Sequence, residues 1–403
     1  MAVVFNVYFA GVVAKDAPIN GVTLWSFLIA GSALISGILS PYLGALADIQ
    51  KTRKRWLAGC ALVGGCSTTA LIVASPETLA LTCVLFVLAS ACFTLSLTFY
   101  HSFLNDLSTG KNIGQVSGFG WAIGYIGGGF CLALNLLMIR HPDWFHLPAY
   151  NYWPVRATFF VVGIWWLVFT VPILLWVKES HAASDAGTAP IPPSPLAEAG
   201  RRVMDSFKAA TRYRKNLFLF LIAYLLFNDV IETVIVMASI FAAMELKMGP
   251  DEIVACFLMI QFVAFFGSLG FGKLADRWSN KKALQTSLVL WALMIGWTMG
   301  MRTKTEFWIA SIFVALVLGG SQSVSRSLFG KLIPAGEVAQ FYGFLGLSGK
   351  ISAAAGPLVF GLVHELTGRI RWAIFSMLIL LILGQSLLAL VKEPDSYDKT
   401  PSC

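Results

Sequence analysis

Charged residues are scarce in this chain. Lys, Arg, Asp and Glu make up 12% of its 403 residues, whereas hydrophobic residues make up 57% and the mean hydropathy is +0.74. A soluble protein of this length cannot bury so much apolar surface. The composition therefore excludes a soluble globular protein and indicates a chain whose solvent is lipid.

Enzyme signatures are missing as well. The sequence contains no Gly-Lys-Ser/Thr phosphate loop, no His-x-x-x-His pair and no nucleophile elbow. Six of its seven cysteines lie in apolar runs, and none has the spacing of a metal site or a disulfide framework. We therefore expect no enzymatic activity, no cofactor and no metal.

Most of the sequence consists of long apolar runs separated by short polar breaks. Each is about as long as a helix that crosses roughly 30 Å of hydrocarbon, and helices are required because lipid cannot satisfy backbone polar groups. The sequence thus predicts an all-α membrane protein with spans at 22–47, 56–75, 78–101, 116–139, 155–177, 216–244, 252–275, 283–301, 306–328, 339–364 and 370–391.

A shorter apolar stretch, residues 2–13, precedes these eleven spans. About 12 residues reach only about half the bilayer at 1.5 Å per residue. No basic region precedes it and no cleavage site follows it, so it is not a secretory signal peptide. We interpret it as the end of a first helix that is truncated in this sequence.

The net charge of +8 follows the membrane topology. When the loops are assigned alternately to two sides, one side carries 20 of the 29 Lys and Arg residues and the other carries 8. This positive-inside bias places both termini in the cytoplasm. It gives no reason to expect a nucleic-acid partner.

The chain also contains an internal repeat. Residues 44–48 (Gly-Ala-Leu-Ala-Asp) return as residues 272–276 (Gly-Lys-Leu-Ala-Asp), and residues 102–126 align without gaps on residues 327–351. Two parallel halves are the layout of transporters that rock about a central site. The repeat predicts two pseudo-symmetric six-helix halves, at 1–179 and 216–391, followed by a cytoplasmic tail at 392–403.

The segment between the halves, 180–215, is predicted to be a cytoplasmic linker. Residues 180–200 are rich in Pro, Ala and Ser and cannot fold alone. Residues 201–215 are basic, with a few apolar residues at helical spacing. They are either a helix on the inner membrane surface or a solvated connector.

Small residues recur every four positions on matching spans of the two halves. Such stripes let helix backbones approach closely in lipid, and at matched places they predict a sliding contact between the halves. Static packing of ordinary membrane helices is the alternative. The predicted interface residues are Ser36, Ser40, Gly120, Gly124, Gly128, Ser268 and Gly349.

These motifs resemble a known family. The Gly-x-Leu-Ala-Asp elements with following basic residues are similar to the cytoplasmic signature of the major facilitator superfamily. Residues 119–129 (Phe-Gly-Trp-Ala-Ile-Gly-Tyr-Ile-Gly-Gly-Gly), 319–329 and 347–350 resemble the bacterial relatives of the autophagy-related vacuolar amino-acid effluxers. The resemblance implies a twelve-helix major facilitator fold. Members usually have a longer first helix, which opens with Asp-Trp-Ala-Asn.

Three charged residues lie near the middle of predicted spans, where each costs on the order of 3 kcal/mol. Asp229 and Glu232 share a helix face, and Lys350 lies at a depth within one turn of Asp229. We predict a cavity ion pair or proton site, with Asp229 as the partner of Lys350. A structural salt bridge is the alternative.

Further candidates follow from position and from the resemblance. The polar-capable residues expected near the cavity are Trp121, Tyr125, Asn228 and Gln322. The family signature implies a cytoplasmic gate made of Asp48, Arg53, Asp276 and Arg277. Arg326, near the end of its span, is expected to pair with a loop or with headgroups.

The sequence thus predicts a monomeric secondary transporter of a small organic solute that works by alternating access. Amino acids are the solute that the family resemblance favours, and protons are a candidate coupling ion. An exporter of drug-like or peptide-like compounds and a non-transporting membrane receptor or scaffold remain alternatives. A cavity with buried charges favours transport, whereas a collapsed apolar centre favours a scaffold.

Overall fold

The computed structural model describes residues 5–148, 150–179, 192–210 and 215–394, and every regular element among them is a helix. Eleven helices have 18 or more residues. They are α2 (Gly21–Gln50), α3 (Arg53–Ala70), α4 (Leu79–Ser102), α6 (Ile113–Arg140), α7 (Trp153–Trp176), α9 (Lys215–Met244), α10 (Pro250–Arg277), α11 (Asn280–Trp297), α12 (Lys304–Leu332), α13 (Val338–Thr367) and α14 (Ile370–Leu390). Each overlaps one predicted span.

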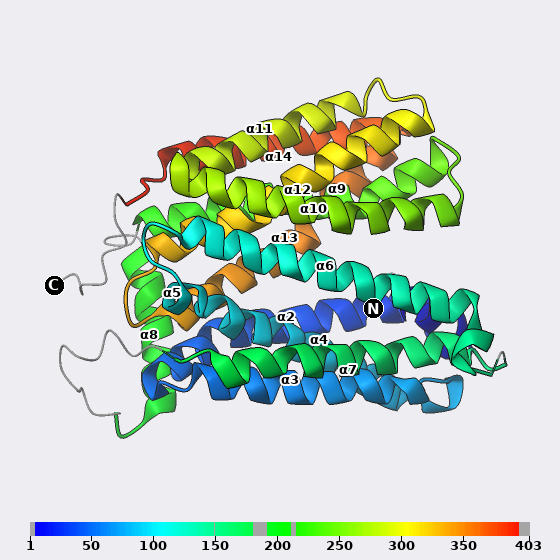
Figure 1. The fold of residues 1–403 in the computed structure, drawn as a ribbon, viewed down its shortest axis with the longest axis horizontal. Helices are drawn as coiled ribbons and strands as arrows, with labels where there is room; N and C mark the ends of the chain where they lie inside the picture. The colour runs from blue at the N-terminus through cyan, green and yellow to red at the C-terminus, as the bar shows by residue number, and fades with distance from the viewer. Residues whose placement is uncertain (1–4, 149, 180–191, 211–214, 395–403) are drawn as a thin grey trace.

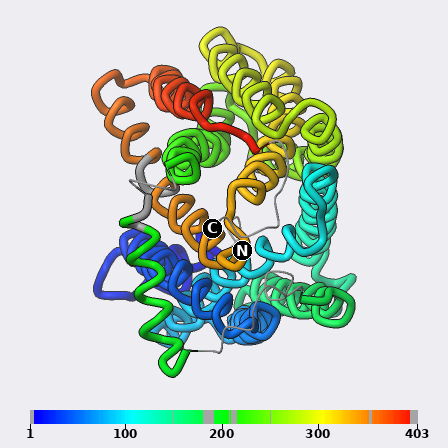
Figure 2. The backbone as a smooth tube through the Cα atoms, turned by 90° about the vertical axis from the view of Figure 1, so that its left-hand side faces the viewer, coloured from blue at the N-terminus to red at the C-terminus, as the bar shows by residue number. Residues whose placement is uncertain are grey.

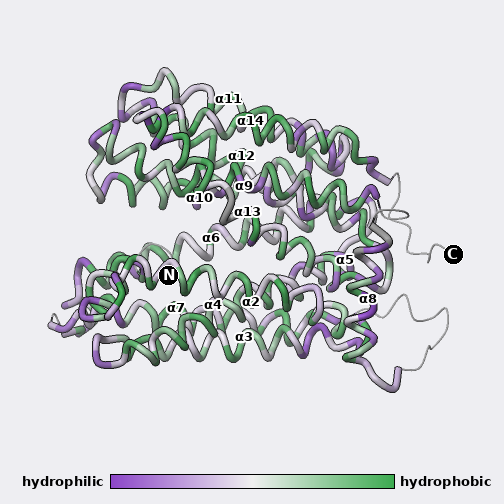
Figure 3. The backbone as a smooth tube through the Cα atoms, turned by 180° about the vertical axis from the view of Figure 1, so that it is seen from behind, coloured by the Kyte–Doolittle hydropathy of each residue, from purple (hydrophilic) through white to green (hydrophobic). Residues whose placement is uncertain are grey.

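Ten of these helices are long and apolar enough to cross a membrane. The exception, α11, has 18 residues and begins with the polar sequence Asn280-Lys281-Lys282. Figure 3 shows hydrophobic residues over the middle lengths of the helices and hydrophilic residues toward their ends. Many large apolar side chains are exposed, such as Trp176 at 77% and Leu358 at 73%. This pattern suits a bundle surrounded by lipid.

The N-terminal stretch forms α1 (Phe5–Tyr8), which continues as a turn of π-helix, η1 (Phe9–Val13). The ring of Phe5 packs against those of Trp25, Phe86 and Phe159 at centroid distances of 5.0 to 5.5 Å. The Tyr8 hydroxyl donates a hydrogen bond of 2.7 Å to the carbonyl of Ala74. These residues therefore pack between α2, α4 and α7, as expected for the end of a first helix.

The long helices run side by side, and α8 (Pro195–Ala210) crosses one end of them (Figure 1). We call this the α8 end and the opposite end the distal end. Helices α1–α7 form the N-terminal group, in which α3 packs on α4 and α7. Helices α9–α14 form the C-terminal group, in which α9 packs on α14 and α10 on α12. The groups meet through α6 against α10 and through α2 against α13, on two sides of the interface (Figure 2).

Glycines let these helices touch near the α8 end. A Cβ atom on Gly114 of α6 would lie 2.7 Å from the carbonyl oxygen of Gly272 on α10, and one on Gly118 would lie 3.1 Å from the Gly272 Cα. On the other side, a Cβ on Gly44 of α2 would lie 2.8 Å from the backbone nitrogen of Gln340. Any larger residue would push these helices apart.

The predicted small-residue stripes are placed in part as expected. Ser36, Ser40 and Ser268 are fully buried, and Gly120 and Gly128 face Arg326 and Gln261 of the C-terminal group. Gly124 and Gly349 do not take part, contrary to the prediction. Gly124 is exposed with no atom within 4 Å of an added Cβ, and the nearest atom to Gly349 belongs to Tyr224 of its own group. Along α6, Gly124 points between the directions of Gly120 and Gly128, since four residues exceed one turn only slightly, but no neighbouring atom lies opposite it.

These contacts give a matched pair of variants on one helix. Gly118→Val should separate α6 from α10 and cost the closed α8 end about 1–3 kcal/mol, which overpacking typically costs. Gly124→Val should leave this end closed, because its added carbons enter open space. The distance between spin labels at Arg55 and Lys282, both exposed at the α8 end, measures the change in a cysteine-free background. Equal distance distributions in the two variants would contradict this packing.

Candidate functional site

Two carboxylates join the groups at the α8 end. The Asp276 side chain, at the end of α10, accepts hydrogen bonds of 2.8 Å from the backbone N–H groups of Gly114 and Gln115. The Asp48 side chain, at the end of α2, accepts one of 2.9 Å from the backbone N–H of Gln340. Each carboxylate thus caps the first turn of α6 or α13 in the opposite group, where orphan N–H groups and the helix dipole favour negative charge.

The basic residues of the predicted gate behave differently. Arg53 pairs within its own group, with Asp106 at 2.8 Å and with Glu179 at 3.4 Å. Arg277 is exposed. The acidic residues of the repeated signature therefore reach across the interface, whereas Arg53 ties α3 to the N-terminal group.

A second pair of acidic residues caps helices within each group. Glu179 accepts hydrogen bonds from the backbone N–H groups of Arg53 and Lys54, and Glu393 accepts them from those of Asn280 and Lys281. Burial raises the pKa of Glu393, but these donors and the Lys331 ammonium at 2.8 Å outweigh it and hold the pKa below its ordinary value. This cap therefore stabilises the fold above the ordinary carboxyl pKa and weakens as the pH falls through the lowered pKa.

Helix α8 lies across both groups at this end. The Tyr42 hydroxyl of α2 donates to the carbonyl of Leu196 at 3.2 Å. The Gln340 side-chain amide of α13 donates to the Ser206 hydroxyl at 2.8 Å and to the carbonyl of Arg202 at 3.3 Å. The described part of the predicted linker is therefore a docked helix, and residues 180–191 and 211–214 lie outside the described residues.

Arg326 crosses the interface one layer deeper. Its guanidinium donates to the Ser117 hydroxyl at 2.9 Å and to the Ser117 carbonyl at 2.8 Å. It also lies over the rings of Tyr100 and Trp121, at 5.8 and 5.9 Å from their centroids. The side chain is buried, with 6% exposed. The expected pairing with a loop or headgroups was wrong, because α12 turns this residue toward α6.

A polar cluster lies near mid-depth, and it contains residues from both groups. Glu232 of α9 lies within electrostatic reach of Lys350 on α13, and the Gln322 side chain of α12 lies beside Glu232. Tyr125 of α6 and Tyr224 of α9 lie within electrostatic reach of Glu232 as well. Tyr125, Gln322 and Lys350 are about 15–18 Å from the α8 ends of their helices at 1.5 Å per residue.

Asp229 does not pair with Lys350, so the predicted partner was wrong. Its Oδ1 accepts a hydrogen bond of 2.7 Å from the backbone N–H of Gly356, six residues beyond Lys350 on α13, and its residue is 98% buried. An added Cβ at Gly356 would lie 2.6 Å from this oxygen, so the glycine makes room for the contact. Asn228 is buried beside it.

Trp121 links the cluster to Arg326. Its ring lies 5.8 Å from that of Tyr125 and 6.5 Å from that of His101. Its Nε1 is buried and has no hydrogen-bond acceptor among the described residues. Five sequence candidates thus lie along one path, namely Trp121, Tyr125, Glu232, Gln322 and Lys350, whereas Ser117 and Gln340 were not expected. Gln340 had a signal, since the repeat aligns it with Gln115.

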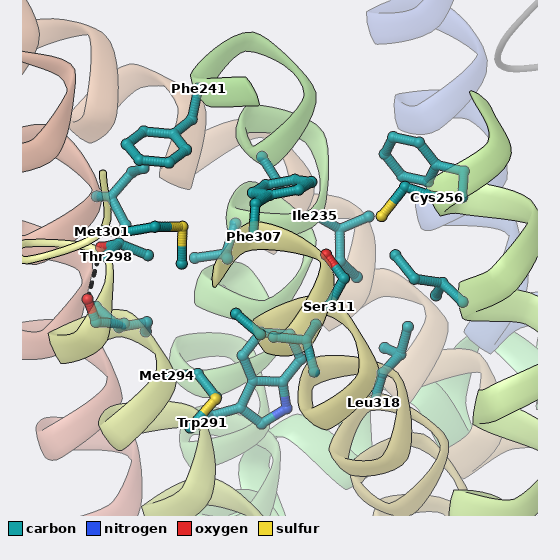
Figure 4. Close-up of a pocket in the computed structure, with 18 of the residues that line it drawn as sticks. Ile235, Phe241, Cys256, Trp291, Met294, Thr298, Met301, Phe307, Ser311 and Leu318 are labelled. Atoms are coloured by element: carbon teal, nitrogen blue, oxygen red, sulfur yellow. Dashed lines mark hydrogen bonds between the residues drawn. The ribbon is translucent and has the colours of Figure 1, made fainter. Parts of the chain in front are cut away.

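A separate apolar cavity of about 140 Å³ lies within the C-terminal group, toward the distal end (Figure 4). Phe241, Met294 and Phe307 are among the side chains that surround it, and Trp291 forms part of its wall. All its lining residues belong to α9–α12, α14 or the loop after α11. Because no residue of the N-terminal group lines it, this cavity does not join the two groups.

Residues 7–399 match the family model described as "Vacuole effluxer Atg22 like". The chain belongs to this Atg22-like family. It is 31% identical, over 92% of its length and 85% of the relative's, to an uncharacterized MFS-type transporter, YxiO, of Bacillus subtilis. It is 25% identical, over 96% of its length and 77% of the relative's, to Autophagy-related protein 22-1 of Penicillium rubens.

Solved structures show the same fold. The proton:xylose symporter XylE matches this Atg22-like protein with a TM-score of 0.70 at 13% identity, over 97% of this chain and 91% of that one. FucP in the outward conformation matches with a TM-score of 0.72 at 12% identity, over 92% and 90%. The predicted major facilitator fold is confirmed, and the protein is an integral membrane secondary transporter.

The two carboxylate caps give the second prediction. Asp48→Asn and Asp276→Asn should each weaken the closed α8 end by about 1 kcal/mol, or about fivefold, because a helix terminus loses its anionic cap. The effects should add in the double variant, because the caps belong to separate contacts.

The Arg55–Lys282 spin-label distance measures the open fraction, and Arg277→Gln serves as the control because Arg277 is exposed. If Arg277→Gln raises the open fraction as much as Asp276→Asn does, the effect comes from charge near the interface and not from helix capping.

Proposed function

We propose that this transporter moves amino acids across the bacterial inner membrane by alternating access. It works as a monomer with both termini in the cytoplasm, so the α8 end is cytoplasmic. Its moving units are residues 1–179 and 216–391, joined by the linker 180–215 and followed by the tail 392–403. Protons exchange with the central cluster.

The central cluster is the observation that carries this proposal. Glu232, Lys350 and Gln322 come from the C-terminal group, and Tyr125 comes from the N-terminal group. Buried charges in lipid are costly and persist where they have a function. A cluster that contains both an acid and a base suits a zwitterionic solute, and its two-sided origin suits a site that each group can uncover in turn.

The distribution of contacts supports alternating access. Most hydrogen bonds between the groups lie at the α8 end or one layer inside it, including those of Asp48, Asp276 and Arg326. At the distal end, among the described residues, Arg140 and Asp251 form the ion pair between the groups. The geometry fits a state closed toward the cytoplasm, and releasing the α8 end gives the opposite state.

Family membership supports the solute class. The family model is that of vacuole effluxers, and the motifs at residues 119–129 and 319–329 resemble those of the amino-acid effluxers in it. The apolar cavity of Figure 4 does not favour a drug exporter, because it lies inside one group. Its position suits packing within the C-terminal group better than a path between the groups.

Counterflow in proteoliposomes tests the function. Vesicles that contain the wild-type protein are loaded with a mixture of twenty unlabelled L-amino acids. They should accumulate a labelled amino acid faster than equally loaded vesicles without protein or with the Lys350→Ala variant. No counterflow with any amino acid would refute amino-acid transport. Counterflow of lipophilic cations alone would favour the drug-exporter alternative, and none with any solute would favour a receptor or scaffold.

The proximity of Glu232 and Lys350 gives a further prediction. Lys350→Ala should reduce transport about tenfold or more, because it leaves the Glu232 charge buried and uncompensated. Combining it with Glu232→Gln should restore part of the activity, whereas combining it with Asp229→Asn should not, because Asp229 bonds to Gly356.

The dependence of transport on pH distinguishes proton coupling by Glu232 from a purely structural role. Glu232→Gln should flatten the dependence of transport on pH, because the variant carries no exchangeable proton at this position. An unchanged profile together with a lower melting temperature would assign the pair to folding. Rescue of Lys350→Ala by Asp229→Asn would contradict the observed pairing.

A further inference from the structure

Arg326 is a buried cation without a protein counter-ion. Among the described residues it forms no ion pair, and its bonds go to the neutral Ser117. Burying an unpaired charge costs several kcal/mol in a medium of low dielectric constant. Its Nη1 makes no hydrogen bond with any described residue. The guanidinium therefore has both unbalanced charge and spare donors.

The surroundings of Arg326 supply a second donor and open space. The buried Nε1 of Trp121 has no acceptor among the described residues, and the Arg326 guanidinium lies over the Trp121 ring. Gly120 faces the guanidinium, with an added Cβ 3.0 Å from Nη2. One turn farther along α6, Gly124 is exposed and leaves room for a ligand. Arg326 Nη1 and Trp121 Nε1 are thus two hydrogen-bond donors without acceptors among the described residues, and such a pair suits an anion.

The geometry points to a carboxylate-binding site formed by Arg326 and Trp121. We infer that the transported solute places its carboxylate here. The planar guanidinium offers parallel N–H donors that match the two oxygens of a carboxylate. This inference rests on the proposed function for the identity of the solute, but the anion site itself follows from the unpaired charge.

The neighbouring cluster accounts for the other end of the solute. Gln322 precedes Arg326 by one turn on α12, about 6 Å of helix, and lies beside Glu232. A zwitterionic solute with its carboxylate on Arg326 would thus direct its ammonium group toward Glu232.

The site also connects binding to opening. The guanidinium that would receive the carboxylate also holds Ser117 through Nε and Nη2, and the Ser117 hydroxyl donates to the carbonyl of Ser323 at 2.6 Å. A carboxylate that takes both Nη1 and Nη2 competes with the Ser117 carbonyl for Nη2, and its full charge makes it the stronger acceptor. Binding therefore loosens one tie between the groups at the α8 end.

The test uses the purified full-length protein and compares carboxylates with compounds in which an uncharged amide replaces the carboxylate. The probes are the twenty L-amino acids, the amide of each and short monocarboxylates without an amino group, with affinity taken from the shift in melting temperature against concentration. Wild type should bind an amino acid at least about tenfold more tightly than its amide, as expected for hydrogen bonds to a charged group.

Arg326→Gln should abolish this preference and Arg326→Lys should keep part of it. Trp121→Phe should weaken it, which provides a second route if the arginine variants do not fold. Ser117→Ala serves as the control, since it removes the hydroxyl acceptor and keeps both the backbone carbonyl and the cation, and the preference should persist. Equal binding of acids and amides by wild type, a preference that survives Arg326→Gln, or no response to any probe would overturn the inference.

The outcomes separate this site from the function. If amino acids show counterflow but their amides bind as tightly, the carboxylate site is wrong and the proposed function stands. If monocarboxylates bind through Arg326 while no amino acid shows counterflow, the site stands and the proposed function is wrong.

Discussion

The arrangement of the two groups depends on carboxylates that cap helices across the interface. In lipid, apolar surface gains little from helix association, so polar contacts and close backbone packing must hold the groups together. Asp48 and Asp276 supply the polar contacts, and Gly44, Gly114 and Gly118 allow the close approach. Glycine packing places the helix N-termini within reach of the carboxylates, and the remaining contacts at this end build on that placement.

The sequence predicted the architecture well for a physical reason. A span in lipid needs about 20 apolar residues, so length and hydropathy alone define it, and each of the eleven spans overlaps a helix. The repeat likewise identified the two aspartates, since matching residues in pseudo-symmetric halves occupy matching places. Both signals are local or periodic, and neither requires knowledge of which side a helix presents to its neighbours.

Side-chain partners were less predictable, because they depend on helix rotation. Depth along the axis suggested Asp229 as the partner of Lys350, but rotation directs Glu232 to Lys350 and Asp229 to the backbone of α13. Arg326 was misjudged for the same reason, as its position near a helix end said nothing about its direction. Gly124 and Gly349 were assigned to the interface from spacing alone, which does not show whether another backbone lies opposite, as it does at Gly118.

The two carboxylate caps lie on two sides of the interface, one where α2 meets α13 and the other where α6 meets α10 (Figure 2). In the proposed transport cycle, the loss of one cap leaves the other as the contact about which the groups can rotate. Helix α8 bonds to α2 through Tyr42 and to α13 through Gln340. These bonds brace the α2–α13 side, so we expect the α8 end to separate first between α6 and α10.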